Sequence, residues 1–108
     1  MSHQKSISLE ALRQILSSGQ KNVRLIDIRS PEEYQKQHIP AAINIPAETI
    51  DFVNFSQEEV VICICNHGKK RSQQVAAVLY DKGYLNACYL EGGTAIWFDA
   101  ESTPKIKQ

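Results

Sequence analysis

The chain has 108 residues and carries 12 basic and 12 acidic side chains, so its formal net charge is zero. This balance argues against a protein that binds nucleic acid or an anionic membrane surface, because both functions need an excess of positive charge. The length predicts a single domain over residues 1–108, and no apolar run approaches the about 18 residues of a membrane-spanning helix, so we expect a cytoplasmic protein without a membrane partner.

The first third of the chain predicts a helix, a strand and a second helix. Apolar residues recur at the spacing of a helix over residues 8–16, with Ser8 as a candidate N-cap and Gly19 as a candidate stop. Residues 23–28 are typical of a strand. Residues 30–33 read Ser-Pro-Glu-Glu, which is the pattern of a capping box with proline in the first turn and predicts a short helix.

The middle of the chain predicts two strands around a short helical segment. Residues 42–45 form a short predicted strand between two prolines, and residues 48–53 suit one or two helical turns. The β-branched run at 60–64 favours a central strand that is buried on both faces.

The last part of the chain predicts a helix, a strand and a short helix. A helix over residues 71–82 is expected to end before Gly83, because glycine suits the position after a helix C-terminus. Residues 87–90 predict the last strand, residues 94–98 a final short helix, and the polar tail 100–108 is expected to be frayed. The residues expected on the buried face of the first of these helices are Val75, Val78 and Leu79.

Strands that alternate with helices predict an α/β fold with a mostly parallel sheet. In such sheets, functional sites form beyond the carboxyl ends of the strands. Cys65 stands at one such end, Asp27 and Arg29 at another, and residues 91–93 follow a third. We therefore expect these positions to meet in one cleft. Asp27 and Arg29 are interpreted as a structural salt bridge or, alternatively, as support for the loop after Cys65.

Cys65 ends an apolar strand and is followed by a polar loop that leads into a helix. A helix N-terminus and nearby cations lower the pKa of a thiol. If the loop curls around Cys65, the backbone amides of residues 66–71 can form a nest that binds an anion, and Gly68 allows a tight turn or a positive φ. The pattern favours a reactive thiolate over its alternative, a buried, inert cysteine followed by a solvated basic turn.

The side chains of the same loop suit a substrate with anionic oxygens. Arg71 can hold an oxyanion through two parallel hydrogen bonds, and Ser72 can donate its hydroxyl to the thiolate or cap the helix. We therefore expect the thiolate to attack a sulfur, phosphorus or arsenic centre. The candidate anion-binding residues are Asn66, His67, Gly68, Lys69, Lys70, Arg71 and Ser72.

The three cysteines predict neither a disulfide framework nor a metal site. Their number is odd and no pair has CxxC spacing, so reduced thiols in a reducing compartment are expected. Cys63 is expected in the strand core, with a role as resolving thiol for an oxidised Cys65 as the alternative. Cys88 is expected in the core of the last strand.

Four segments, in this order, resemble the rhodanese family of single-domain sulfurtransferases. They are residues 25–34, residues 38–46, the Cys65 loop with its helix up to Gly83-Tyr84, and residues 90–97. The resemblance implies a five-stranded, mostly parallel sheet with helices on both faces, and Cys65 as the residue that accepts sulfur as a persulfide. It also implies a donor such as thiosulfate and an acceptor such as cyanide, a thiol or a thioredoxin-like protein. We expect no cofactor.

The sequence departs from the family pattern at two points. Ala41 stands where the family usually has glycine, which we expect to be a minor change in the backbone. Arg71 follows Cys65 in a Cys-x5-Arg-Ser pattern, one residue longer than the family commonly has. This loop length occurs in related cell-cycle phosphatases and arsenate reductases of the same fold. A small phosphatase or arsenate reductase is therefore one alternative function, and a rhodanese-like interaction module without turnover is another.

Overall fold

A computed structural model describes residues 5–102 of the chain, in which strands and helices alternate. The strands are β1 (Ser6–Ile7), β2 (Val23–Asp27), β3 (Ile43–Asn44), β4 (Val60–Ile64) and β5 (Ala87–Leu90). The helices are α1 (Leu9–Ser17), α2 (Pro31–Lys36), the 3-10 helix η1 (Ala47–Phe52), α3 (Lys70–Asp81) and α4 (Gly93–Ser102). Within the described residues, no helix is both long enough and apolar enough to cross a membrane.

The five strands form one sheet in the order β1-β5-β4-β2-β3, and every pair is parallel. This confirms the α/β fold class. β4 lies in the middle of the sheet, as its apolar and mostly β-branched sequence predicted, and it pairs with β2 from Val60 opposite Val23 to Ile64 opposite Asp27. The carboxyl ends of β2, β4 and β5 are therefore neighbours.

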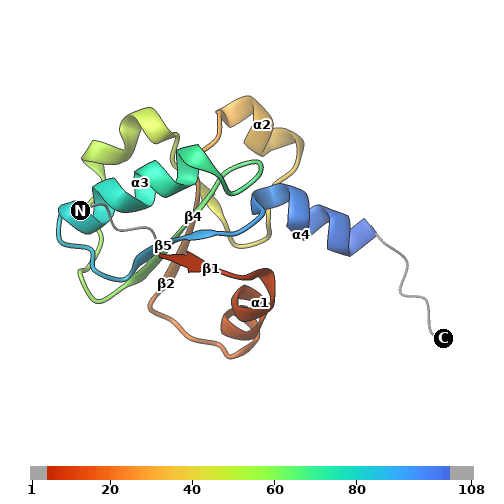
Figure 1. The fold of residues 1–108 in the computed structure, drawn as a ribbon, viewed down its shortest axis with the longest axis horizontal. Helices are drawn as coiled ribbons and strands as arrows, with labels where there is room; N and C mark the ends of the chain where they lie inside the picture. The colour runs from red at the N-terminus through yellow and green to blue at the C-terminus, as the bar shows by residue number, and fades with distance from the viewer. Residues whose placement is uncertain (1–4, 103–108) are drawn as a thin grey trace.

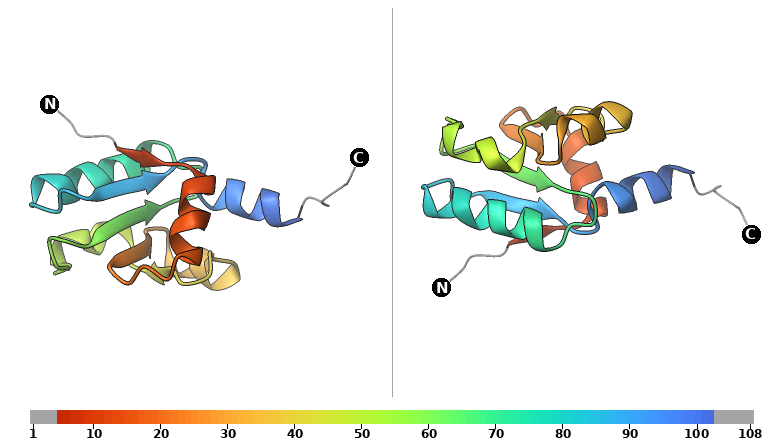
Figure 2. Two further views of the ribbon diagram at one scale, coloured as in Figure 1. Left: turned by 90° about the horizontal axis from the view of Figure 1, so that it is seen from below. Right: turned by 90° about the horizontal axis from the view of Figure 1, so that it is seen from above.

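Helices cover both faces of the sheet. Figure 1 shows α3 and η1 on one side of the strands and α1 on the other. Figure 2 shows α4 extending from the end of the sheet toward which the strands point. This placement brings the start of α4 to the edge where a functional site is expected.

Alternating residues of β4 fill two separate apolar cores. Val61 and Cys63 pack with Val75, Ala76 and Leu79 on the face covered by α3. The other face holds a second cluster, made of Leu12, Leu25, Ile39, Ala42, Ile62, Ile64, Cys88, Leu90 and Trp97. Because successive side chains of a strand point to opposite faces, the central strand anchors both layers at once.

The capping signals in the sequence are confirmed. The Ser8 side chain accepts a hydrogen bond from the Ala11 amide at 3.1 Å and begins α1. Ser30 and Glu33 form both halves of a capping box at the start of α2. Gly83 follows the C-cap of α3 with a φ of +107°. Local side-chain chemistry thus sets where these helices begin and end.

Two expectations need correction, and one strand is absent from the prediction. Val78 is 39% exposed rather than buried, and α3 instead turns Ser72 and Ala76 inward together with Val75 and Leu79. The last helix extends to Ser102, so residues 100–102 are helical rather than frayed, and the rest of the predicted tail, residues 103–108, lies outside the described residues. β1 was not predicted, because two residues are too short to show an alternating pattern.

Ala41 adopts a backbone conformation that favours glycine. The Ala42 amide donates to the Ile39 carbonyl at 3.0 Å, which closes a turn with Pro40 and Ala41 in the middle. The φ of Ala41 is +74°. Proline followed by a residue of positive φ is the pattern of a type II turn, in which glycine is preferred at the second central position. The replacement of the usual glycine is therefore a source of strain rather than a minor change.

Ala41→Gly is expected to raise the free energy of unfolding by about 0.5–1 kcal/mol, because it relieves this strain at an exposed position. Urea unfolding measures the change. Gly19 has the same φ of +74° and open space around it, so Gly19→Ala should lower the stability by a similar amount. A less stable Ala41→Gly protein would contradict the prediction.

Candidate active site

The carboxyl ends of three neighbouring strands bring together residues that the sequence singled out. Cys65 follows β4, Asp27 ends β2 with Arg29 just beyond it, and the Gly92-Gly93 pair follows β5. The strands lie side by side in the order β5-β4-β2. The loop after Cys65 is therefore bordered on one side by the start of α4 and on the other by the end of β2.

The N-terminus of α4 holds the first two loop residues by their carbonyl oxygens. The Thr94 amide donates to the Cys65 carbonyl at 2.9 Å, and the Ala95 amide donates to the Asn66 carbonyl at 2.9 Å. The first amides of a helix have no partner within the helix, so the loop satisfies them. The amides that hydrogen-bond to the sulfur of Cys65 come from Gly68 and Lys69, at the end of the loop, and from Ser72, in the first turn of α3.

Two glycines let the loop and the start of α4 pack backbone against backbone. A Cβ on Gly68 would lie 2.2 Å from the Leu90 carbonyl oxygen, and a Cβ on Gly93 would lie 2.2 Å from the Cys65 carbonyl oxygen. Gly68 also has a φ of +63°, as the sequence predicts. The contacts of α4 with the loop were not predicted, and the only sequence signal for them is the glycine pair before this helix.

The Cys65 thiol lies in a polar ring although it is only 5% exposed. Its Sγ lies 3.1 Å from Ser72 Oγ. The protonated thiol donates a hydrogen bond to this hydroxyl oxygen, and the thiolate accepts one from the hydroxyl. Burial by itself raises the pKa of Cys65, but the hydrogen bonds from the Ser72 hydroxyl and from the backbone amides of Ser72, Lys69 and Gly68 outweigh it. The pKa of Cys65 is therefore below its ordinary value, and the cause is hydrogen bonding rather than the nearby loop cations.

The other two cysteines have raised pKa values. All three cysteines are free thiols. Burial raises the pKa of Cys63 far above its ordinary value and raises the pKa of Cys88 to about 11. Both residues lie in the core, as predicted. The alternative role of Cys63 as a resolving thiol is disfavoured, because a fully buried thiol that stays protonated is a poor nucleophile.

A buried ion pair supports the loop from β2. Arg29 donates from Nε and Nη2 to the Asp27 carboxylate at 2.8–3.1 Å, and Asp27 is fully buried. The remaining guanidinium nitrogen, Nη1, donates to Asn66 Oδ1 at 3.2 Å. The two roles considered for Asp27 and Arg29, a structural salt bridge and support for the loop, are thus both present.

The Asn66 side chain is held from two directions. Besides the bond from Arg29 to its oxygen, Asn66 donates from Nδ2 to Glu33 Oε2 at 2.9 Å. The hydrogen bond from Asn66 is the first cause of the lowered pKa of Glu33, followed by the Ser30 amide. The sequence predicted Glu33 only as a helix cap. Its contact with the loop spans 33 positions of sequence, and no local pattern marks it.

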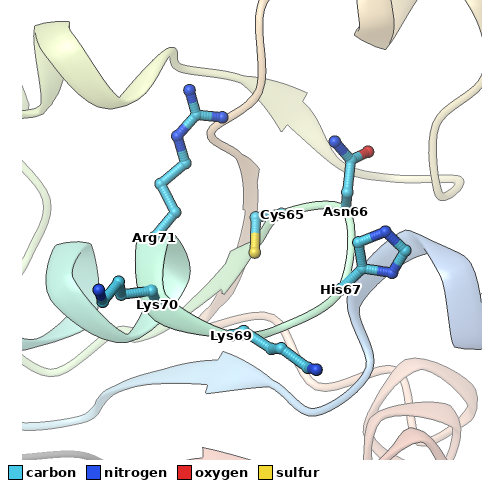
Figure 3. Close-up of a pocket in the computed structure, with 6 residues that line it drawn as sticks. All are labelled: Cys65, Asn66, His67, Lys69, Lys70 and Arg71. Atoms are coloured by element: carbon cyan, nitrogen blue, oxygen red, sulfur yellow. The ribbon is translucent and has the colours of Figure 1, made fainter.

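The charged side chains of the loop lie at the mouth of the site. Arg71 extends away from Cys65 Sγ (Figure 3), and the hold of Arg71 on an oxyanion stays a prediction. Ser72, by contrast, is buried and contacts the sulfur. Among residues 5–102, no group of three or more His, Cys, Asp or Glu side chains is arranged to hold a metal ion. The residues that line the pocket, about 200 Å³ in volume, are Cys65, Asn66, His67, Lys69, Lys70 and Arg71.

Comparison with known proteins identifies relatives of this chain. The model of the rhodanese-like domain family matches residues 8–100. The thiosulfate:glutathione sulfurtransferase of Saccharomyces cerevisiae is 30% identical over 90% of this chain and 80% of that protein. The putative sulfur carrier protein YrkF of Bacillus subtilis is 30% identical over 84% of this chain, which spans about half (49%) of that protein. The structure of the human single-domain sulfurtransferase TSTD1 matches with a TM-score of 0.82 and 28% identity, over 93% of this chain and 100% of that one.

The lowered pKa of Cys65 predicts selective alkylation in mildly acidic solution. Because the thiolate is the reactive form, iodoacetamide at about pH 6–7 should modify Cys65 before Cys63 and Cys88. Ser72→Ala removes a hydrogen bond to the sulfur, so the pKa of Cys65 should rise and the pH midpoint of alkylation should move upward. Peptide mass spectrometry gives the rate at each cysteine, and equal rates at all three would rule out the activated thiol.

Gly68→Ala is expected to open the loop. The added Cβ meets backbone atoms of Leu90, Gly92 and Gly93, so the variant should lose about 2–4 kcal/mol of stability, and Cys65 should lose its rapid alkylation. Gly19→Ala is the matched control, because it introduces alanine at a similar φ without a close contact. Equal losses of stability in the two variants would show that the close approach of the loop to α4 does not contribute to the stability of the protein.

Proposed function

The chain belongs to the rhodanese-like domain family, and from this premise we propose that it is a sulfurtransferase whose catalytic residue is Cys65. The observation that carries the assignment of Cys65 is its position beyond the carboxyl end of β4, where its Sγ lies 3.1 Å from Ser72 Oγ and hydrogen bonds from backbone amides lower its pKa. The thiolate is the form of cysteine that attacks sulfur, and inward-facing amides stabilise negative charge. The relatives named as sulfurtransferases support the same reaction.

In the first half of the reaction, Cys65 accepts the outer sulfur of a donor such as thiosulfate. The Cys65 thiolate attacks that sulfur, the bond between it and the sulfite group breaks, and sulfite leaves with the electron pair. Cys65 then carries a persulfide. The amides of Gly68, Lys69 and Ser72 that stabilise the thiolate also stabilise the negative charge of the persulfide.

The pocket beside the thiol suits a small anionic donor. Lys69, Lys70 and Arg71 supply three positive charges at its rim, although the chain as a whole is neutral. Local clustering of this kind attracts an anion and raises its concentration at the site. The three side chains are exposed, so we assign them to steering and binding the donor and leave the activation of the thiol to the amide ring.

In the second half of the reaction, an acceptor removes the outer sulfur and regenerates the Cys65 thiolate. Cyanide, a small thiol or a thioredoxin-like protein are the acceptors we consider. The three free cysteines support a reducing compartment, and we propose the cytoplasm. We further propose that residues 1–108 act as a single domain without a cofactor.

The alternative functions have less support. A phosphatase or an arsenate reductase is supported only by the loop length, whereas the relatives described above are named as sulfurtransferases or as a sulfur carrier. Arsenate reduction also needs a second accessible thiol, and Cys63 is buried with a raised pKa. An interaction module without turnover has no use for a thiol of lowered pKa.

The proposed function predicts that one sulfur atom is added to the protein by thiosulfate. Intact-mass measurement should show the gain in the wild type and in Cys88→Ser, whose altered thiol lies in the opposite core, but not in Cys65→Ser. Subsequent addition of cyanide should release thiocyanate and restore the original mass. Absence of added sulfur, together with Cys65-dependent hydrolysis of an aryl phosphate, would favour the phosphatase instead.

A further inference from the structure

His67 borders the thiol pocket on the side of α4. It lines the pocket that contains Cys65, and it also lines a neighbouring hollow beside α4. Its ring is exposed and extends from the loop toward the side of α4, whereas Lys70 and Arg71 lie on the other side of the pocket (Figure 3). A molecule that enters the pocket from the hollow therefore passes His67 before it reaches the sulfur.

The two halves of the proposed reaction differ in their need for proton transfer. In the first half, Cys65 attacks as a thiolate and sulfite leaves with the electron pair, so no proton has to move. In the second half, a thiol acceptor arrives mostly protonated, because an ordinary thiol is only a few per cent ionised at pH 7. The thiolate is the form that attacks sulfur, so the acceptor must lose this proton.

Cys65 is not the group that takes up the proton. It leaves as a thiolate, and the hydrogen bonds from the Ser72 hydroxyl and from backbone amides that lower its pKa stabilise that charged form. Lys69, Lys70 and Arg71 are cations at neutral pH and have no free position for a further proton. The proton of the acceptor therefore has to pass to another group or directly to solvent.

The imidazole of His67 has the chemistry that this step needs. A neutral imidazole accepts a proton near neutral pH and readily gives it up again. The amide side chain of Asn66, which also lines the pocket, does not. Among the described residues that line the thiol pocket, His67 alone combines a basic nitrogen with an exposed position beside the path of an incoming thiol.

The charged groups around His67 favour removal of the proton at this place. Lys69 lines both spaces with His67, Lys70 and Arg71 line the thiol pocket, and Asp99 of α4 is the acidic residue of the hollow. The three cations of the pocket stabilise the negative charge that develops on the acceptor sulfur as its proton leaves.

We propose that His67 is a catalytic residue of the second half-reaction, the general base that takes the proton from an acceptor thiol. The proton passes to an imidazole nitrogen while the acceptor sulfur attacks the outer sulfur of the Cys65 persulfide. The sulfur–sulfur bond at Cys65 breaks, Cys65 leaves as a thiolate with the electron pair, and the acceptor becomes a persulfide. His67 then returns the proton to solvent. The inference rests on the proposed function, because it requires a persulfide at Cys65.

The experiment measures sulfur transfer separately from loading. The full-length protein is loaded with thiosulfate, freed of excess donor, and mixed at pH 7 with 2-mercaptoethanol, which is mostly protonated, or with 4-nitrothiophenol, which is already ionised. Intact-mass measurement after rapid quenching follows the loss of the added sulfur. The rate of each variant is divided by the wild-type rate with the same thiol, so differences in reactivity between the two thiols cancel.

His67→Gln should slow transfer to 2-mercaptoethanol by about 10- to 100-fold, because a general base contributes about a hundredfold or more and thiolate from solution replaces part of the loss. It should slow transfer to 4-nitrothiophenol far less, because this thiol has no proton to lose. The deficit with 2-mercaptoethanol should shrink as the pH approaches the pKa of that thiol.

His67→Lys keeps a positive charge at the same position but cannot accept a proton at neutral pH, so with 2-mercaptoethanol it should be as slow as His67→Gln. Lys70→Gln is the matched control, because it removes a charge from the same pocket and leaves the imidazole in place. It should change the rate with the two thiols by similar factors.

Two results would overturn the role of His67 as a base while leaving the sulfurtransferase intact. One is an equal slowing of His67→Gln with the protonated and the ionised thiol. The other is a wild-type rate of His67→Lys with 2-mercaptoethanol, which would assign the effect to charge. A wild-type protein that takes up no sulfur from thiosulfate would instead overturn the proposed function itself.

Discussion

The hydrogen bonds between the N-terminus of α4 and the loop after Cys65 are the constraint on which the site depends. Thr94 and Ala95 engage the carbonyls of Cys65 and Asn66, and the absence of side chains at Gly68 and Gly93 permits the close approach. On the opposite side, Arg29 and Glu33 hold the Asn66 side chain. A loop fixed on both sides loses little further conformational freedom when its amides bind a charged sulfur.

A comparison of two cysteines shows what this constraint achieves. Cys63 and Cys65 belong to the same core cluster, and both are almost inaccessible to solvent. Burial raises the pKa of both thiols, and only Cys65 has hydrogen-bond donors that reverse the effect. Reactivity at this site therefore arises from the polar partners of the sulfur, while exclusion of water makes each of those hydrogen bonds stronger.

The sequence was informative wherever the physical cause is local. The caps at Ser8 and Ser30, the β-branched run of β4 and the glycine after α3 all act within a few residues, and the structure confirms them. The exposure of Val78 does not follow from helical spacing, because the spacing does not show how far around α3 the sheet reaches. The contacts of Asn66 with Arg29 and Glu33, and those of α4 with the loop, join distant segments, so only the fold could reveal them.

The loop is built so that two of its properties depend on different atoms. Its shape and its effect on Cys65 come from backbone groups, from Ser72 and from the glycines, whereas the side chains of His67, Lys69 and Lys70 point outward. Changes at these three positions can therefore alter which molecules approach the sulfur without rebuilding the amides that activate it. Substrate preference can therefore change through the surface side chains while the chemistry at Cys65 stays the same. These side chains are the positions at which to engineer new acceptor specificities.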